Sequence, residues 1–135
     1  MLKIFRLSHW AHLRGIPLLP RMLYAINRVL FSVVLPPSVE IGRDVILAYG
    51  GLGTVIHARC KIGAGVQIGT NVTIGGRSGF QEVPIIEDDV LIGTGAKILG
   101  PIVVGRGARI GANAVVLENV PPDVTVVGIP ARPVR

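Results

Sequence analysis

A repeat of six residues runs through most of this chain of 135 residues and limits its possible folds more than any other feature. From residue 39 onward an isoleucine or valine returns at every sixth position, and a glycine often follows it. The fifth residue of each hexad is small or β-branched, and these positions are Val45, Cys60, Val66, Val72, Val90, Ala96, Ala108 and Ala114. Such a repeat predicts a parallel β-helix, because one unit buries its apolar face only against neighbouring units.

The alternation of side chains along a strand explains the composition of each hexad. The first and fifth positions point the same way, so a large aliphatic and a smaller side chain together fill a narrow interior. Glycine, asparagine and aspartate between them allow sharp corners, because these residues adopt positive φ most readily. Three hexads make one coil, and successive coils stack about 4.8 Å apart like neighbouring strands. Cys60 falls in an interior slot, and we expect it to be a small core residue.

Two interruptions break the repeat, at residues 47–55 and 75–85. Counting faces along the coils places Ile56 one coil from Ile74, and therefore His57 one rung from the start of the second interruption. The first interruption ends directly before Ile56. The count therefore predicts that both interruptions converge on one corner, and that His57 lies there.

The segment before the repeat, residues 1–36, has a different character. Apolar residues at spacings of three and four predict amphipathic helices over residues 2–14 and 18–34. The segment holds five basic residues and no acidic one, which leaves nine basic and eight acidic residues for the β-helix domain, 37–135. A basic amphipathic helix can lie on an anionic membrane, and it can also pack on a neighbouring element or subunit. The sequence leaves both alternatives open.

Composition argues against several classes of protein. No apolar run approaches the ~20 residues of a membrane-spanning helix, and polar residues interrupt the apolar stretch that a signal peptide would need. The single cysteine excludes an internal disulfide and fits a reducing compartment. We therefore expect a cytoplasmic location, peripheral at the inner membrane face if residues 1–35 bind lipid. Basic and aromatic residues are not interleaved, so nucleic acid is not an expected partner.

Three stretches carry a resemblance to a known family, namely IGTGAKILGPI at 92–102, RIGANAVVL at 109–117 and the closing VVGIPARPVR. With the hexads, they resemble the left-handed β-helix acyltransferases of the hexapeptide-repeat superfamily, in particular serine acetyltransferases and related O-acetyltransferases of bacterial polysaccharide pathways. The resemblance covers about residues 36–135. It implies an all-β, left-handed parallel β-helix with a short α-helical N-terminal segment. It also implies a homotrimer that binds acetyl-CoA in a cleft between adjacent subunits.

The face count also stacks Thr70, Thr94 and Ala112 at one corner of successive coils. A flat edge of small residues suits a long, thin ligand that carries amide groups. In the similar enzymes, the residues matching Thr94 and Ala112 line the pantetheine arm of coenzyme A. We therefore expect the donor to bind along this edge.

Acyl transfer to a hydroxyl needs a base that removes the proton as the oxygen attacks the thioester. Histidine exchanges protons most readily near neutral pH, and His57 is the only histidine of the β-helix, so we expect it to be the general base. Backbone N–H groups of Gly75 or Gly76 are candidates to stabilise the charge that develops on the thioester oxygen. No metal is expected, because a carbonic anhydrase on this fold needs three histidine ligands around zinc.

Two departures from serine acetyltransferases bear on the acceptor. Those enzymes have an Asp-His pair where this chain has Ala48 and Tyr49, and Asp-Arg-His-Pro where it has QEVP at 81–84. The arginine that contacts the amino-acid carboxylate is thereby replaced by Glu82. We therefore expect a sugar hydroxyl as the acceptor, with Tyr49, Arg77, Gln81 and Glu82 as candidate contacts. Serine with a rearranged site, and a non-catalytic β-helix used for assembly or binding, are the alternatives.

Overall fold

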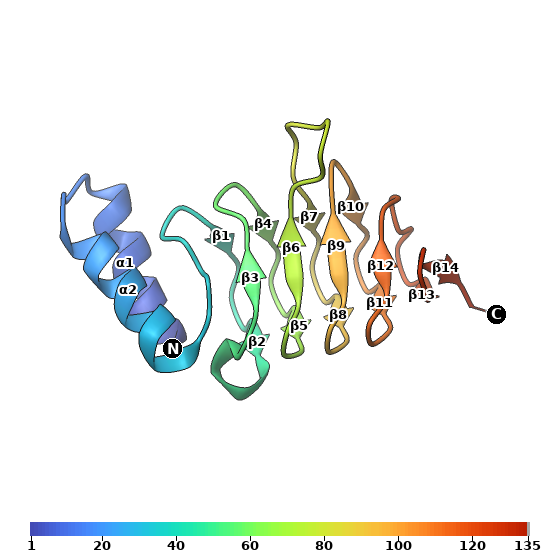
Figure 1. Ribbon diagram of the computed structural model, residues 1–135, viewed down its shortest axis with the longest axis horizontal. Helices are drawn as coiled ribbons and strands as arrows, with labels where there is room; N and C mark the ends of the chain where they lie inside the picture. The colour runs from blue at the N-terminus through green and yellow to red at the C-terminus, as the bar shows by residue number, and fades with distance from the viewer. Residues whose placement is uncertain (135) are drawn as a thin grey trace.

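The computed structural model describes residues 1–134 as two N-terminal helices followed by a stack of parallel coils (Figure 1). Helix α1 spans Leu2–Leu13 and helix α2 spans Leu19–Phe31, which confirms the two predicted helices. The second helix ends three residues earlier than expected, because Ser32 adopts a left-handed conformation with φ of 52°. The helices lie together at one end of the stack, and the C-terminus lies at the other.

The strands form three sheets, one for each face of the coil, and we name each sheet after its first strand. The β1 sheet holds β1 (Glu40–Ile41), β4 (Lys61–Ile62), β7 (Ile85–Ile86) and β10 (Val103–Val104). The β2 sheet holds β2 (Ile46–Leu47), β5 (Gln67–Ile68), β8 (Leu91–Ile92), β11 (Arg109–Ile110), β13 (Thr125–Val127) and the antiparallel β14 (Arg132–Pro133). The β3 sheet holds β3 (Val55–Ile56), β6 (Thr73–Gly75), β9 (Lys97–Leu99) and β12 (Val115–Val116).

The register of the sheets confirms the coil of three hexads. Ile92 pairs with Ile110, eighteen positions later, where no interruption intervenes. Ile56 pairs with Ile74, as the face count predicted. The interruptions lengthen single coils without shifting this register, because the extra residues leave at corners and the strands resume in place.

The interior of the stack is a column of aliphatic side chains. Ile56, Ile74, Ile98 and Val116 lie above one another on the β3 sheet and are at most 2% exposed. Full burial of one such side chain stabilises the fold by about 1.5–3 kcal/mol. The column leaves no room for ligands inside the coil, so chemistry is confined to its corners and outer faces.

Helix α1 closes the first coil of this column. The Phe5 ring is 1% exposed and belongs to the same core cluster as the interior isoleucines. Beside it, the Arg6 guanidinium donates hydrogen bonds to the carbonyl oxygens of Ile41 (2.7 Å) and Gly42 (2.6 Å). The end of the stack is thereby covered by an aromatic ring, and two of its carbonyl groups are satisfied by Arg6.

Cys60 is buried in the interior, as its hexad position predicted, with 1% of its surface exposed. Burial raises the pKa of its thiol from 9.0 to about 11, against smaller opposite effects of a backbone hydrogen bond at His57 and the charge of Arg59. The nucleophilic form of cysteine is the thiolate, so this side chain is inert near neutral pH.

We therefore predict that a thiol reagent labels Cys60 only after the chain is unfolded. Because the folded pKa is the higher one, the thiol contributes stability that is full below pH 9 and is lost as pH rises toward about 11. The free energy of unfolding, measured by denaturant titration at pH values across this window, should fall more steeply with pH for the wild type than for Cys60→Ala. Rapid labelling of the native protein at neutral pH would contradict the burial.

Candidate functional site

Each coil turns at three corners, and two of them carry the predicted site residues. The first, here the groove corner, links the β2 sheet to the β3 sheet and includes residues 69–72, 93–96 and 111–114. The second, here the loop corner, links the β3 sheet to the β1 sheet and includes residues 57–60 and 76–84. The β3 sheet separates the two corners.

The two interruptions do not converge on one corner, and this prediction was wrong. The first forms a 3₁₀ turn, η1 (Ala48–Gly51), at the groove corner, whereas the second forms a long loop at the loop corner. Figure 1 shows them on opposite sides of the stack. The reason is that β3 crosses the whole face between Thr54 and His57, so the first insertion and the histidine stand at opposite ends of one strand.

His57 begins the loop corner one rung from the root of the long loop, as the count predicted. Its backbone N–H donates to the carbonyl oxygen of Ile74 at 2.8 Å. Its ring nitrogen Nδ1 accepts the backbone N–H of Arg59 at 3.1 Å. Because a neutral imidazole carries one proton, this contact places the proton on Nε2, which is then a donor. The ring can take up a proton at Nε2 only after it leaves the Arg59 amide and its own proton moves from Nε2 to Nδ1.

The long loop is tied to the same corner by Arg59, whose guanidinium donates to the carbonyl oxygen of Gln81 at 2.6 Å. Within the loop, the Arg77 guanidinium lies 5.6 Å from the centre of the Phe80 ring. A hollow of about 330 Å³ opens beneath the loop and mixes both signs of charge. Its lining residues are Arg59, Lys61, Gln81, Glu82, Val83 and Ile85. The structure thus unites the predicted residues Gln81 and Glu82 with two basic residues that the sequence analysis did not single out.

The groove corner holds the stacked small residues in the predicted register. The N–H of Gly95 donates to the carbonyl of Thr70, and the N–H of Asn113 donates to the carbonyl of Thr94, each at 2.9 Å. A Cβ added to Gly93 would approach the backbone nitrogen of Ala112 to 2.6 Å, so close stacking of corners requires glycine there. A shallow hollow of about 240 Å³ lies along this edge and includes Ala48 and Thr94 in its lining.

The remaining predicted residues are divided between the two corners. Gly75 lies in β6 opposite Leu99, and Gly76 follows it, exposed and with open space on the side where a Cβ would stand. Tyr49 is 88% exposed in η1 at the groove corner, with φ of 51°. In one chain Tyr49 therefore lies apart from Arg77, Gln81 and Glu82.

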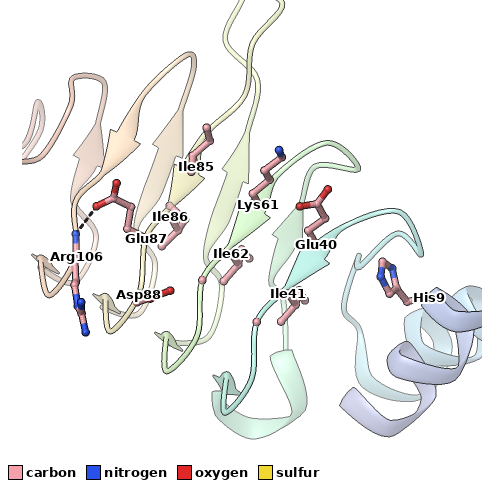
Figure 2. Close-up of a pocket in the computed structure, with 12 residues that line it drawn as sticks. His9, Glu40, Ile41, Lys61, Ile62, Ile85, Ile86, Glu87, Asp88 and Arg106 are labelled. Carbon is pink, nitrogen blue, oxygen red and sulfur yellow. Dashed lines mark hydrogen bonds between the residues drawn. The ribbon is translucent and has the colours of Figure 1, made fainter. Parts of the chain in front are cut away.

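A larger hollow, of about 660 Å³, runs along the outer face of the β1 sheet and holds none of the predicted residues (Figure 2). His9 of α1, Glu40, Lys61 and Glu87 line it from successive elements. Several of its polar groups are already engaged, because Glu87 Oε2 accepts the Arg106 N–H at 2.8 Å and Asp88 Oδ1 accepts the Ala64 N–H at 2.9 Å. These two carboxylates stabilise corners of the β-helix. Across residues 1–134, no cluster of three or more histidine, cysteine, aspartate or glutamate side chains could hold a metal ion.

Comparison with known proteins places this architecture among transferases. Residues 84–118 match the family described as bacterial transferase hexapeptide (six repeats). A serine acetyltransferase of Bacillus pumilus is 43% identical over 129 residues, which are 94% of this chain and 59% of that protein. The serine acetyltransferase of Escherichia coli K12 is 43% identical over 133 residues, which are 97% of this chain and 48% of that protein. The chain spans about half the length of these curated relatives.

Solved structures agree in fold. Serine acetyltransferase of Brucella abortus in complex with coenzyme A matches 98% of this chain and 54% of its own, with 34% identity and a TM-score of 0.92. Soybean serine acetyltransferase complexed with serine matches 98% of this chain and 55% of its own, with 37% identity and a TM-score of 0.92. The left-handed β-helix of hexapeptide repeats with two N-terminal helices is thereby confirmed.

Proposed function

Since the chain belongs to the hexapeptide-repeat superfamily of acyltransferases, we propose that it transfers an acetyl group from acetyl-CoA to a hydroxyl group. The observation that carries this proposal is the match in fold, over 98% of the chain, to a serine acetyltransferase that binds coenzyme A. The groove corner supports it, because Thr94 and Ala112 offer the flat edge that the resemblance assigns to the pantetheine arm.

Serine is the acceptor that we propose. The relatives and structures described above are named for serine and none of them for a saccharide, so the sugar acceptor expected from the sequence has no support from them. The hollow under the long loop can supply the positive charge for an amino-acid carboxylate that the replaced arginine would have supplied. Arg59 and Lys61 can bind a carboxylate, and Glu82 can bind an ammonium group. A pocket with both charges suits a zwitterion better than it suits a neutral sugar.

The reaction requires one proton transfer at the acceptor. A base takes the proton of the hydroxyl group as its oxygen bonds to the thioester carbon, the carbon–sulfur bond breaks, and coenzyme A leaves as the thiol after it receives a proton. We assign the base to His57. Its ring must first release the Arg59 amide and carry its own proton on Nδ1 in place of Nε2. The hydrogen bond that is given up is worth only about 0.5–1.5 kcal/mol. Gly76 is the better candidate of the two glycines to stabilise the charge on the thioester oxygen through its N–H, because it is exposed and follows the end of β6.

In this proposal the groove corner of one subunit acts together with the loop corner of a neighbouring subunit, and the two corners of a single chain do not form a site. From Thr94 to Gly100 the chain crosses the β3 sheet. The three residues of β9 alone span about 10 Å of this face, and the corner residues on either side lengthen the path. A thioester held at the groove corner therefore cannot meet His57 of the same chain along the face of one coil. A cyclic homotrimer places the groove corner of one subunit against the loop corner of the next, and Tyr49 would then approach the acceptor from the neighbouring chain.

The acceptor is tested by mixing the protein with acetyl-CoA and with serine, nucleotide-sugars or lipid-linked sugars, and following the release of free thiol. We predict turnover with serine that exceeds turnover with each sugar. Buried Cys60 should give no background in this assay. Turnover with a sugar alone would refute serine as the acceptor and keep the acetyltransferase, whereas no turnover and no binding of coenzyme A by calorimetry would support a non-catalytic β-helix.

Replacement of His57 tests the base. We predict that His57→Ala lowers kcat by roughly 10²–10⁴-fold, the range for loss of a general base. His57→Gln should be as slow, because an amide can donate a hydrogen bond but cannot take up a proton. His12→Ala, at an exposed histidine of α1, is the matched control and should retain the full rate. If His57→Gln retains the wild-type rate, the ring serves as a donor through Nε2–H and is not the base.

A further inference from the structure

Helix α2 exposes a continuous apolar strip on the side that faces away from its buried residues. With 100° between residues in an α-helix, the strip occupies about 100° of arc. Its members are Leu18 at the N-cap, Met22, Ala25, Ile26 and Val29, which we name the outer strip. Val29 is 80% exposed, Leu18 is 67% exposed and Met22 is 59% exposed, whereas Pro20 and Asn27 on the opposite side are buried. The strip is therefore not the face that packs the helix onto the protein.

Basic side chains border the outer strip and no acidic side chain does. Arg21 and Arg28 stand seven residues apart, two turns of helix, along one edge of the strip, and both are exposed. Arg14 lies nearby in sequence, with its guanidinium 5.4 Å from the centre of the Trp10 ring, and Trp10 is 48% exposed on α1. An apolar strip with an arginine edge is the composition of helices that lie in a membrane interface, where exposed tryptophans are also enriched.

We propose that the outer strip docks this protein onto an anionic phospholipid surface, with the helix lying in the interface. The charge decides between this occupant and a second copy of the chain. Two outer strips packed face to face would bring together arginines from a segment of 36 residues that has no acidic residue to pair with them. Anionic headgroups neutralise the same arginines. No helix within residues 1–134 is long and apolar enough to cross a membrane, so the contact is peripheral.

The position of the helices is compatible with activity on the surface. They lie at the N-terminal end of the stack, and the coils extend away from them toward the C-terminus (Figure 1). The groove corner and the loop corner run along these coils, so lipid under α2 leaves their later rungs open. The inference concerns residues outside both corners and is independent of the proposed reaction.

Sedimentation with vesicles tests the proposal on the full chain. We expect the protein to pellet with phosphatidylcholine vesicles that contain about 30 mol % phosphatidylglycerol, to remain in solution with phosphatidylcholine alone, and to be released by about 0.5 M NaCl. Each arginine near such a surface contributes roughly fivefold to partitioning, so Arg21→Glu with Arg28→Glu should weaken binding at least about 25-fold. Met22→Ser with Val29→Ser should also weaken it, because the apolar contact is lost.

The matched control reverses two exposed arginines of the β-helix, Arg43→Glu with Arg109→Glu, which change the net charge equally. This control should bind within about threefold of the wild type. Equal loss in the control and in the α2 variant would overturn the proposal, because attraction would then follow net charge alone. Absence of binding to anionic vesicles would also overturn it, and a smaller assembly of the Met22→Ser, Val29→Ser variant by light scattering would then identify the strip as a contact between copies.

Discussion

The stacking of one aliphatic side chain above another, rung after rung, is the interaction on which this structure depends. Each strand has only two or three residues, too few to hold a sheet by backbone hydrogen bonds alone. Ile56, Ile74 and Ile98 stay in line because the interior of the coil has a fixed width and excludes any other register. Sequence variation is thereby confined to the outward positions and the corners.

Because the column fills the interior of the coil, any binding or catalytic site must lie at the corners or on the outer faces. The same rigid column holds the corners at a fixed distance from one another. The groove corner and the loop corner stand at opposite ends of the β3 sheet, so in the proposed reaction one chain presents two half-sites. Association of identical chains is then a requirement of the proposed reaction, because only a neighbouring subunit can bring the missing half. The hollow under the long loop, which carries charges of both signs, belongs to the half-site at the loop corner. The edge of small residues belongs to the half-site at the groove corner.

Much of this arrangement could be predicted from the sequence, because it follows from periodicity. The hexads were sufficient for the β-helix, for the pairing of Ile56 with Ile74, and for the stacking of Thr70, Thr94 and Ala112. The predicted convergence of the two interruptions failed for a different reason. Ile41 and Leu47 are six residues apart, and so are Ile56 and Ile62, so the three extra residues lie between Leu47 and Ile56. The count therefore locates the first insertion at the groove corner, and the error was to treat the two ends of β3 as one corner.

Contacts made by single side chains also escaped prediction. The Arg59 amide that binds Nδ1 of His57, and the Arg59 guanidinium that ties the long loop to its corner, depend on local geometry that no repeat encodes. The sequence did contain one signal for an anionic ligand. It is the pair of basic residues Arg59 and Lys61, which lie on the rung directly before the one that carries the loop. The loop residues alone favour a sugar, because they lack the arginine and because Arg59 and Lys61 lie outside the loop.

Mixing two inactive variants tests most directly whether the site is divided between subunits. His57→Ala removes the proposed base at the loop corner, and Ala112→Trp fills the groove corner with a large ring at an exposed position that leaves the core intact. The whole population of trimers formed by refolding the two variants together in equal amounts should regain about one quarter of the wild-type activity, because one interface in four then pairs two intact corners. Mixed trimers that remain as inactive as either variant alone would show that each site lies within a single chain, and would contradict the divided site.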